Sequence, residues 1–233
     1  MYWAQNFKKE EIKELIIASI CVGFIAHLFL HMGFRDWVLN WGAATLIAGF
    51  SYVIHEIAHK IWAEKLSFSA EFKLDWKLLL ASLFISTFSS MLGMGILMIM
   101  MGGVHIKKLP SSVLNKEYHN ITKEEEGKIA FMGPASNVLL AVFFKFLEPL
   151  SPAFSAGVYL NLLLALYNTM PFPSLDGLRI FYWSIIPWLS LLLSEIIMIV
   201  LIGWVPFELI FPLLIVIWIF LFFWLQKCTK APY

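Results

Sequence analysis

The chain has 233 residues, of which 60% are hydrophobic and only 14% are charged. Its mean hydropathy of +0.78 lies outside the range of ordinary soluble domains and predicts a polytopic membrane protein. The formal net charge of +1 gives no reason to expect nucleic-acid binding, and the two cysteines, Cys21 and Cys228, show no metal-ligand or disulfide spacing.

A bilayer core requires about 20 apolar residues per helix. The segments that qualify on hydropathy are Ile12–Gly33, Trp37–Trp62, Leu78–Met101, Gly127–Leu147, Ala153–Met170, Pro187–Trp204 and Phe207–Leu225. One of these seven segments, 78–101, is expected to be re-entrant or extra. The predicted fold class is an all-α polytopic membrane protein with about six transmembrane helices, formed by a single domain over residues 1–233. The charged start followed by apolar residues is typical of a first span rather than of a cleaved signal peptide.

The first predicted span contains two histidines, His27 and His31, one helical turn apart. They could form a second metal site or simply face the interior of the bundle. Because no acidic residue lies near them in the sequence, the second interpretation is favoured.

The second span contains "YVIHEIAHKIW", residues 52–62. His55 and His59 are four residues apart, so a helix places both imidazoles on one face, able to bind one metal ion. Glu56 lies beside them, where it can take a proton from an attacking water. The alternative is polar pairing inside a bundle, but a charged residue at mid-bilayer costs about 2.5–3.5 kcal/mol, and a metal accounts for all three residues at once.

Residues 66–76, "LSFSAEFKLDW", alternate strictly between apolar and polar side chains. Such period-two alternation predicts a half-buried strand, either at the membrane surface or on the protein. The shorter alternation "GVHIK" at 103–107 could be its partner in a small hairpin. Thr122 and Glu125, at capping-box spacing, predict that a helix begins just after this region.

The apolar segment 78–101 is interrupted by "STFSSMLGMG". It either crosses the membrane or dips in and returns to the same face. If every apolar segment crosses, lysines and arginines show no bias between the two sides. If segment 78–101 returns, one side holds 15 of the 17 basic residues and Asp176 lies at the depth of His59, which satisfies the positive-inside rule and predicts cytoplasmic termini and a cytoplasmic active-site mouth.

A catalytic zinc site normally has three protein ligands and one open position, so two histidines are not enough. The chain contains three aspartates, of which Asp36 and Asp75 lie at predicted helix or strand edges. Asp176 lies in "YNTMPFPSLDGLRIF", where two prolines and a glycine break a helix and can present an acid inside the protein. Glu195 is a lone acid in an apolar span, which could line a gate or pair with a histidine.

Three motifs in this order carry a resemblance: His55-Glu56-x-x-His59, "GPASN" at 133–137 and "NTMPFPSLDG" at 168–177. Together they resemble the site-2 protease family of intramembrane zinc metalloproteases. No segment resembles a PDZ or CBS domain, so the expected type is the compact prokaryotic one.

The resemblance implies that His55, His59 and Asp176 bind one zinc ion per chain and that Glu56 is the general base. Asn168 matches the family's asparagine that holds the substrate carbonyl or oxyanion. The implied reaction is hydrolysis of peptide bonds in transmembrane helices of other proteins, within the lipid bilayer.

Candidate substrate-binding residues are Asn137, which could instead pack between helices, and the hairpin residues Phe72, Gly103 and Val104. A helix hides its carbonyls, so a substrate must unwind, and the hairpin could hold the unwound segment by strand addition. A plain membrane-surface hairpin is the alternative.

Two other functions fit parts of the pattern. A membrane zinc transporter also carries His and Glu clusters inside its spans, but a second polar helix and a His-rich loop, expected of a transporter, are missing. A catalytically silent relative would not be expected to keep the full ligand and base set. Glu56 distinguishes the alternatives, because a transporter needs it as a ligand and a protease needs it as a base.

Overall fold

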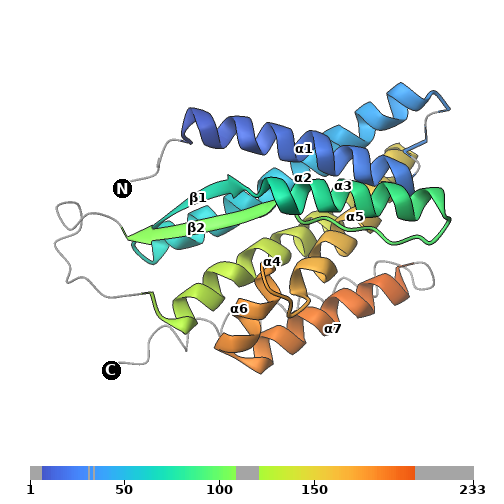
Figure 1. Cartoon of the computed structure of the whole chain (residues 1–233). Helices are drawn as coiled ribbons and strands as arrows, with labels where there is room; N and C mark the ends of the chain where they lie inside the picture. The colour runs from blue at the N-terminus through green and yellow to red at the C-terminus, as the bar shows by residue number, and fades with distance from the viewer. Residues whose placement is uncertain (1–6, 31, 34, 109–120, 203–233) are drawn as a thin grey trace.

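The structure is a computed structural model that describes residues 7–30, 32–33, 35–108 and 121–202. Its elements in chain order are α1 (Lys9–Phe29), α2 (Trp37–Lys65), β1 (Phe68–Leu74), α3 (Trp76–Met91), β2 (Gly102–Lys108), α4 (Lys123–Leu147), the 3-10 turn η2 (Glu148–Leu150), α5 (Pro152–Thr169), α6 (Asp176–Trp183) and α7 (Ile185–Leu201). Helices dominate, and the described sheet is a single hairpin of β1 and β2 (Figure 1). The predicted helical class with one small hairpin is confirmed.

Three stretches are long and apolar enough to cross a membrane by length and composition: α1, α2 and Lys123–Leu150, which combines α4 and η2. They correspond to the first, second and fourth predicted segments. The segments predicted at 153–170 and 187–204 form α5, with 18 residues, and α7, with 17 residues. The segment predicted at 207–225 lies outside the described residues, so a total of six crossings stays a prediction.

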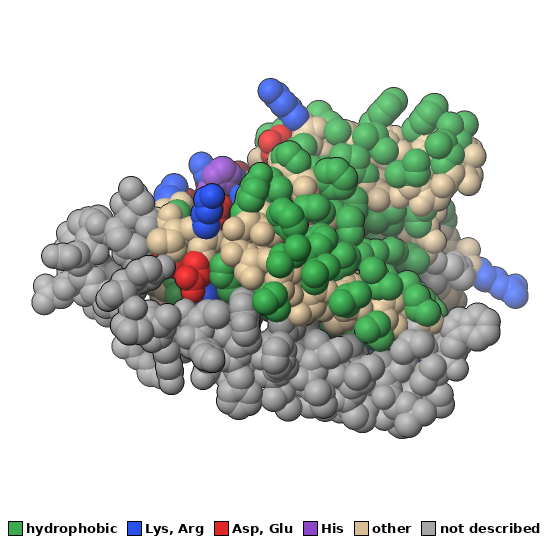
Figure 2. Space-filling view, turned by 90° about the horizontal axis from the view of Figure 1, so that it is seen from below, with side chains coloured by type: hydrophobic (Ala, Val, Ile, Leu, Met, Phe, Trp, Pro, Cys, Tyr) green, Lys and Arg blue, Asp and Glu red, His purple; other side chains and the backbone are tan. Residues whose placement is uncertain are grey.

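The outer surface of the helices is strongly apolar. Leu46 is 76% exposed, Phe84 70% and Leu139 56%. Figure 2 shows hydrophobic side chains over much of the described surface on one face, with most of the charged side chains near one end and a basic side chain at the other. Contiguous apolar surface of this kind is rare on soluble monomers but costs nothing against lipid tails, so it fits a lipid-facing exterior.

Two apolar cores hold the helices together, and α5 contributes to both. In the first core, where α1 packs on α2, Val22 and Ala44 are fully buried with Leu160 of α5. In the second core, Val138 of α4 is fully buried with Leu162 of α5 and with side chains of α6 and α7. Because α5 is fixed on both sides, the chain that leaves its C-terminal end starts from a rigid support.

The hairpin follows α2 after a sharp reversal at Ser67, which has a φ of 69°. The two strands are antiparallel, with Phe72 opposite Val104 and Glu71 opposite His105. The predicted alternation is confirmed within a shorter strand, since β1 covers 68–74 rather than 66–76. Residue 66 caps α2, and residue 76 begins α3, because helices on both sides extend further than the alternation suggests.

The edge of β1 away from β2 is covered by carboxylates of α1. Glu11 accepts a hydrogen bond from the Phe72 N–H (3.1 Å), and Glu14 accepts one from the Leu74 N–H (2.9 Å). Lys60 of α2 bonds to both oxygens of Glu11, at 2.9 and 2.8 Å, in a buried ion pair. In the described part of the chain β2 pairs only with β1, so β2 supplies the open edge of the hairpin.

Segment 78–101 returns to the side on which it starts. α3 ends at Met91, the chain then runs back in extended form, and the Asp75 N–H donates to the Met101 carbonyl (2.9 Å). This is the dip-and-return geometry expected from the charge distribution. A helix for the first 16 residues, followed by an extended return, replaces a continuous span.

Serines on one face of α3 hold the extended return. Ser86 donates to the Met98 carbonyl (3.0 Å) and accepts from the Met98 N–H (2.9 Å). Ser82 makes the same pair of bonds with Met100, at 3.0 and 2.9 Å. Ser89 accepts from the next N–H in the series, that of residue 96, at 2.7 Å. The serine hydroxyls therefore satisfy the backbone polar groups of alternate residues of the return, as a neighbouring strand would.

We predict that Ser86→Ala lowers the free energy of unfolding by about 2–3 kcal/mol, because both backbone groups of Met98 lose their partner in an apolar setting. The measurement is thermal or denaturant unfolding in detergent. Ser90→Ala is the matched control, since Ser90 lies on the same helix outside this serine series. Equal stability of the two variants would show that the serine bonds do not hold the return.

Candidate metal centre

The C-terminal half of α2 buries all three ionisable residues of the predicted metal motif. His55, Glu56 and His59 are each at most 5% exposed. The helix places His55 and His59 one turn apart, and their Nε2 atoms lie 3.1 Å from each other. The local helical prediction for this motif is therefore confirmed.

Asp176 is presented from a break between α5 and α6. α5 ends at Thr169, and two prolines follow before Ser174, which has a φ of 72°. Asp176 then begins α6. The next residue is Gly177, and a Cβ on it would lie 2.0 Å from the Thr169 carbonyl oxygen, so only glycine lets α6 begin this close to the end of α5.

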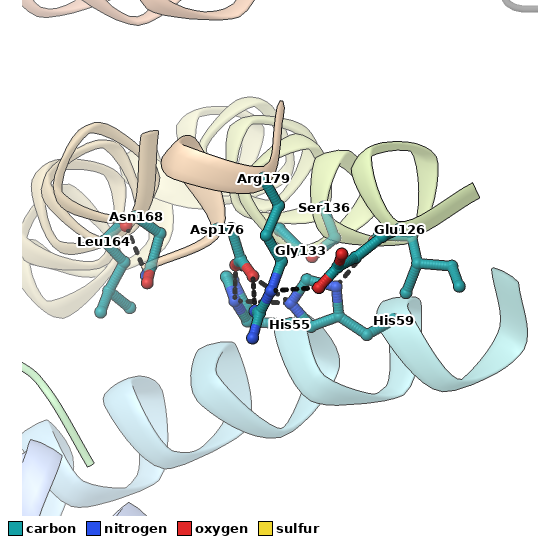
Figure 3. A network of polar contacts seen from close by, with 10 residues as sticks. His55, His59, Glu126, Gly133, Ser136, Leu164, Asn168, Asp176 and Arg179 are labelled. Atoms are coloured by element: carbon teal, nitrogen blue, oxygen red, sulfur yellow. Dashed lines mark hydrogen bonds and ion pairs between the residues drawn. The ribbon is translucent and has the colours of Figure 1, made fainter. Parts of the chain in front are cut away.

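The three predicted ligands meet at one point, although the aspartate is more than 100 residues from the histidines. Asp176 Oδ2 lies 3.1 Å from His55 Nε2 and 3.1 Å from His59 Nε2. Figure 3 shows the carboxylate pointing from one helix toward both imidazoles on the other. These are the residues of the described chain that could hold a metal ion as a group of three.

The spacing and the donor set fit zinc. Tetrahedral Zn²⁺ with ligand bonds of about 2.0–2.2 Å places neighbouring ligand atoms roughly 3.3–3.6 Å apart, close to the separations found here. His59 Nδ1 donates to the Ile129 carbonyl oxygen (2.8 Å), which leaves the lone pair of Nε2 directed at the centre. One carboxylate and two imidazoles are a common catalytic zinc set.

Helix α4 closes one side of the centre through Gly133. A Cβ at this position would lie 2.4 Å from His59 Nε2 and 2.6 Å from His55 Nε2. Gly133 therefore allows α4 to pass directly against the ligand atoms. The same helix begins at the predicted capping box, in which the Glu125 N–H donates to the Thr122 hydroxyl oxygen (3.2 Å).

A small cavity connects the ligands with Glu56. Its lining includes all three ligands, Glu56 and Tyr52. The Tyr52 hydroxyl interacts with the Glu56 carboxylate, and apart from this contact one carboxylate oxygen of Glu56 has no hydrogen-bond partner among the described residues. A carboxylate with a free oxygen beside a metal-binding cluster is placed to accept a proton from water.

Arg179 borders the ligand carboxylate. Its Nη1 atom lies 3.6 Å from Asp176 Oδ1, and its Nε donates to Glu126 of α4 (3.0 Å). The arginine thereby connects α6 to α4 at the rim of the cavity (Figure 3). The positive charge offsets part of the negative charge of the ligand.

Among the other predicted site residues, Asn168, Gly103 and Val104 line the cavity. Asn168 donates to the Leu164 carbonyl oxygen (2.9 Å) within its own helix. Phe72 lies elsewhere: it is buried in the first core with its ring against Tyr52, at a centroid distance of 5.8 Å.

Asn137 is also fully buried and is not part of the cavity lining. Both polar atoms of its amide, and Nδ1 of His55, lack a hydrogen-bond partner among the described residues.

The structure gives partners to His27 and Glu195, whose roles the sequence leaves open. His27 shares a hydrogen bond with Asn40 (2.8 Å between Nδ1 and Nδ2) and contacts the Trp37 ring edge-on. His31 lies outside the described residues. Glu195 accepts a hydrogen bond from the Thr169 hydroxyl (2.8 Å) rather than pairing with a histidine.

Sequence reasoning did not find Tyr52, Ser174 or Arg179, which also line the cavity. Tyr52 could have been found, because it lies four residues before Glu56 and so shares its helix face. Ser174 and Arg179 flank Asp176 in the chain. Ser174 is positioned by its positive φ and Arg179 by its hydrogen bond to α4, and neither feature can be read from the sequence.

Comparison with known proteins agrees with this geometry. The chain is 30% identical over 190 residues, 78% of its length and 89% of the relative, to a protein of Methanocaldococcus jannaschii named "Putative zinc metalloprotease MJ0611". The chain belongs to the site-2 protease-like family of zinc metalloproteases. No protein-family model and no solved structure matches it. Membership of a zinc metalloprotease family accords with the two imidazoles and one carboxylate of the centre.

We predict that Gly133→Ala removes most of the zinc that the purified protein holds, because the new methyl group overlaps both ligand nitrogens. The measurement is metal content per chain by elemental analysis. Gly42→Ala is the matched control, since a Cβ there meets nothing within 4 Å. Full zinc content in a folded Gly133→Ala protein would show that α4 moves away and does not confine the ligands.

Proposed function

We propose that this protein is an intramembrane zinc metalloprotease that hydrolyses peptide bonds within or near transmembrane helices of other membrane proteins. The observation that carries the proposal is the cluster of His55, His59 and Asp176 buried among apolar helices, with Glu56 in the same cavity. When bound there, zinc supplies a Lewis acid that activates water and polarises a carbonyl group.

Glu56 is the general base in this proposal. Glu56 lines the cavity together with the three ligands, so its carboxylate can take a proton from the attacking water and deliver it to the leaving amine nitrogen. Glu56 is not one of the three residues whose ligand atoms converge, which favours a proton-transfer role over metal ligation. This separation of ligands from base also favours a protease over a zinc transporter.

Asn168 is the proposed oxyanion donor. It lies at the end of α5, lines the cavity, and currently donates to a carbonyl of its own helix. An amide group can turn from that weak local partner to a developing oxyanion, where a charge-assisted hydrogen bond is stronger.

The membrane setting follows from the surface and the charge distribution. The helices that hold the centre are apolar outside, and His59 lies six residues before the end of α2, about 9 Å along the axis. In this proposal α2 ends at the membrane surface, and the centre lies below that surface on the side that carries the hairpin. With 15 of 17 basic residues assigned to that side, we place it in the cytoplasm of a prokaryotic cell.

We propose that the substrate enters as an unwound segment that adds to the hairpin at β2. Carboxylates of Glu11 and Glu14 occupy the far edge of β1, so strand addition can use only β2. Gly103 and Val104 of β2 lie at the cavity, which brings an added strand next to the metal ligands.

We predict that Glu56→Gln keeps about one zinc ion per chain and loses about 10²–10⁴-fold in kcat, because the amide cannot accept the proton from water. The measurement is zinc content and cleavage of a membrane-spanning peptide, with Glu64→Gln on the same helix as the control. A transporter would instead show zinc flux in vesicles, abolished by Glu56→Gln, without any peptide cleavage by the wild type.

We predict that Asn168→Ala lowers kcat by about 10²–10³-fold with zinc content unchanged, because one oxyanion donor is removed. Asn168→Gln tests position, since it keeps the amide but moves it by one methylene group. Unchanged kcat in the alanine variant would remove Asn168 from the proposed mechanism and leave the metal centre unaffected.

A further inference from the structure

A second, larger cavity adjoins the metal centre on its open side. Its volume is about 570 Å³, and we name it the outer vestibule. The residues that it shares with the metal cavity are Leu78, Gly102, Gly103, Val104, Ser174 and Arg179. A peptide that passes over Gly103 and Val104 toward the metal ligands therefore also passes through the vestibule.

Four of the twelve residues that line the vestibule have basic side chains: Lys73, Lys77, His105 and Arg179. Asp75 is the one acidic residue among the described lining residues, and its carboxylate is used to cap α3 by accepting the Lys77 N–H (2.9 Å). Lys73 and Lys77 are exposed, and neither forms an ion pair with any residue that the structure describes. Lys73 and Lys77 outnumber Asp75, so this part of the vestibule carries net positive charge.

Two further acids close to the vestibule lining, Glu71 and Glu126, are paired with basic side chains. Glu71, opposite His105 in the hairpin, is bound by Lys8 and Lys107, which lower the pKa of its carboxyl group to about 2. Glu126 is bound by Arg179 (3.0 Å). Neither carboxylate is free to neutralise Lys73 or Lys77.

We propose that the outer vestibule selects substrates with acidic side chains next to the cleaved segment, an inference that rests on the protease function proposed above. Lys73 pairs with Gly103 in the hairpin, and Gly103 lines both the vestibule and the metal cavity. The acidic side chains therefore lie on the part of the substrate that continues from the metal cavity into the vestibule. Aspartate and glutamate there meet Lys73 and Lys77 directly.

The positive charge of the vestibule discriminates between substrates by the charge of their flanking segments. Cytoplasmic flanks of membrane helices are usually rich in lysine and arginine, which the vestibule repels. An acidic flank is uncommon on that side, so attraction to it separates a small group of substrates from the many transmembrane helices that share an apolar core.

The test uses full-length protein in neutral phosphatidylcholine vesicles and peptides with one transmembrane segment and a flank of aspartate, serine or lysine. We expect kcat/KM to be about tenfold higher for the aspartate flank than for the lysine flank, with the serine flank between them and the ratio shrinking as salt rises. In the double variant Lys73→Glu and Lys77→Glu the order should reverse. Lys9→Glu, an exposed lysine outside the vestibule, should keep the wild-type order.

Equal cleavage of the peptides by wild type, or an unchanged order in the double variant, would overturn the inference. It would also be overturned if added anionic lipid raised cleavage of all peptides equally and the double variant abolished that rise, because the vestibule would then bind lipid headgroups. The same peptides carrying a fluorophore are titrated against Glu56→Gln protein, so the charge preference is measured by binding. If the wild type cleaves none of the peptides but the binding order is kept, the protease function is contradicted and the preference for acidic segments stands.

Discussion

The burial of two imidazoles and a carboxylate at one point inside an apolar protein is the constraint on which the rest of the structure depends. The Nε2 atoms of His55 and His59 and the Oδ2 atom of Asp176 lie 3.1 Å from one another. Burying such polar groups away from water costs free energy unless a cation or hydrogen bonds compensate them. The fold meets this constraint through close backbone approach. Gly133 admits α4 to the ligand nitrogens, and Gly177 admits α6 to the end of α5. Gly133 and Gly177 are therefore packing requirements of the centre.

The break that carries Asp176 is irregular backbone, and its position must be fixed by hydrogen bonds to neighbouring elements. Helix α7 supplies two of them at Thr169. The Trp188 indole N–H donates to the Thr169 carbonyl oxygen (2.8 Å), and the Thr169 hydroxyl donates to Glu195 (2.8 Å). Glu195, the lone acid of an apolar helix, thus fixes the residue next to Asn168 in the chain. The position of the aspartate ligand depends in this way on a helix that contributes nothing to the metal centre itself.

Local periodicity allowed much of this structure to be predicted from the sequence. The helix that carries His55 and His59, the alternating hairpin and the cap at Thr122 each depend on residues a few positions apart, and each was found. Asp176 was found because the chain has only three aspartates and two lie at element edges. The contacts of Gly133 and Arg179 could not be predicted, since they depend on the helix that packs opposite. Phe72 shows the same limit: alternation located its strand but not the Tyr52 ring that covers it.

The extended return after α3 connects these observations. Non-helical backbone at membrane depth persists only where protein or a wet cavity satisfies its polar groups. The serines of α3 satisfy alternate groups on one side, and Ile99 to Met101 line the metal cavity on the way into β2. A helix in this place would keep its backbone groups bonded to itself, whereas an extended wall offers them to a neighbour. A peptide must also be extended to expose its carbonyl groups, so the wall beside the centre has the conformation that a cleavable segment must adopt.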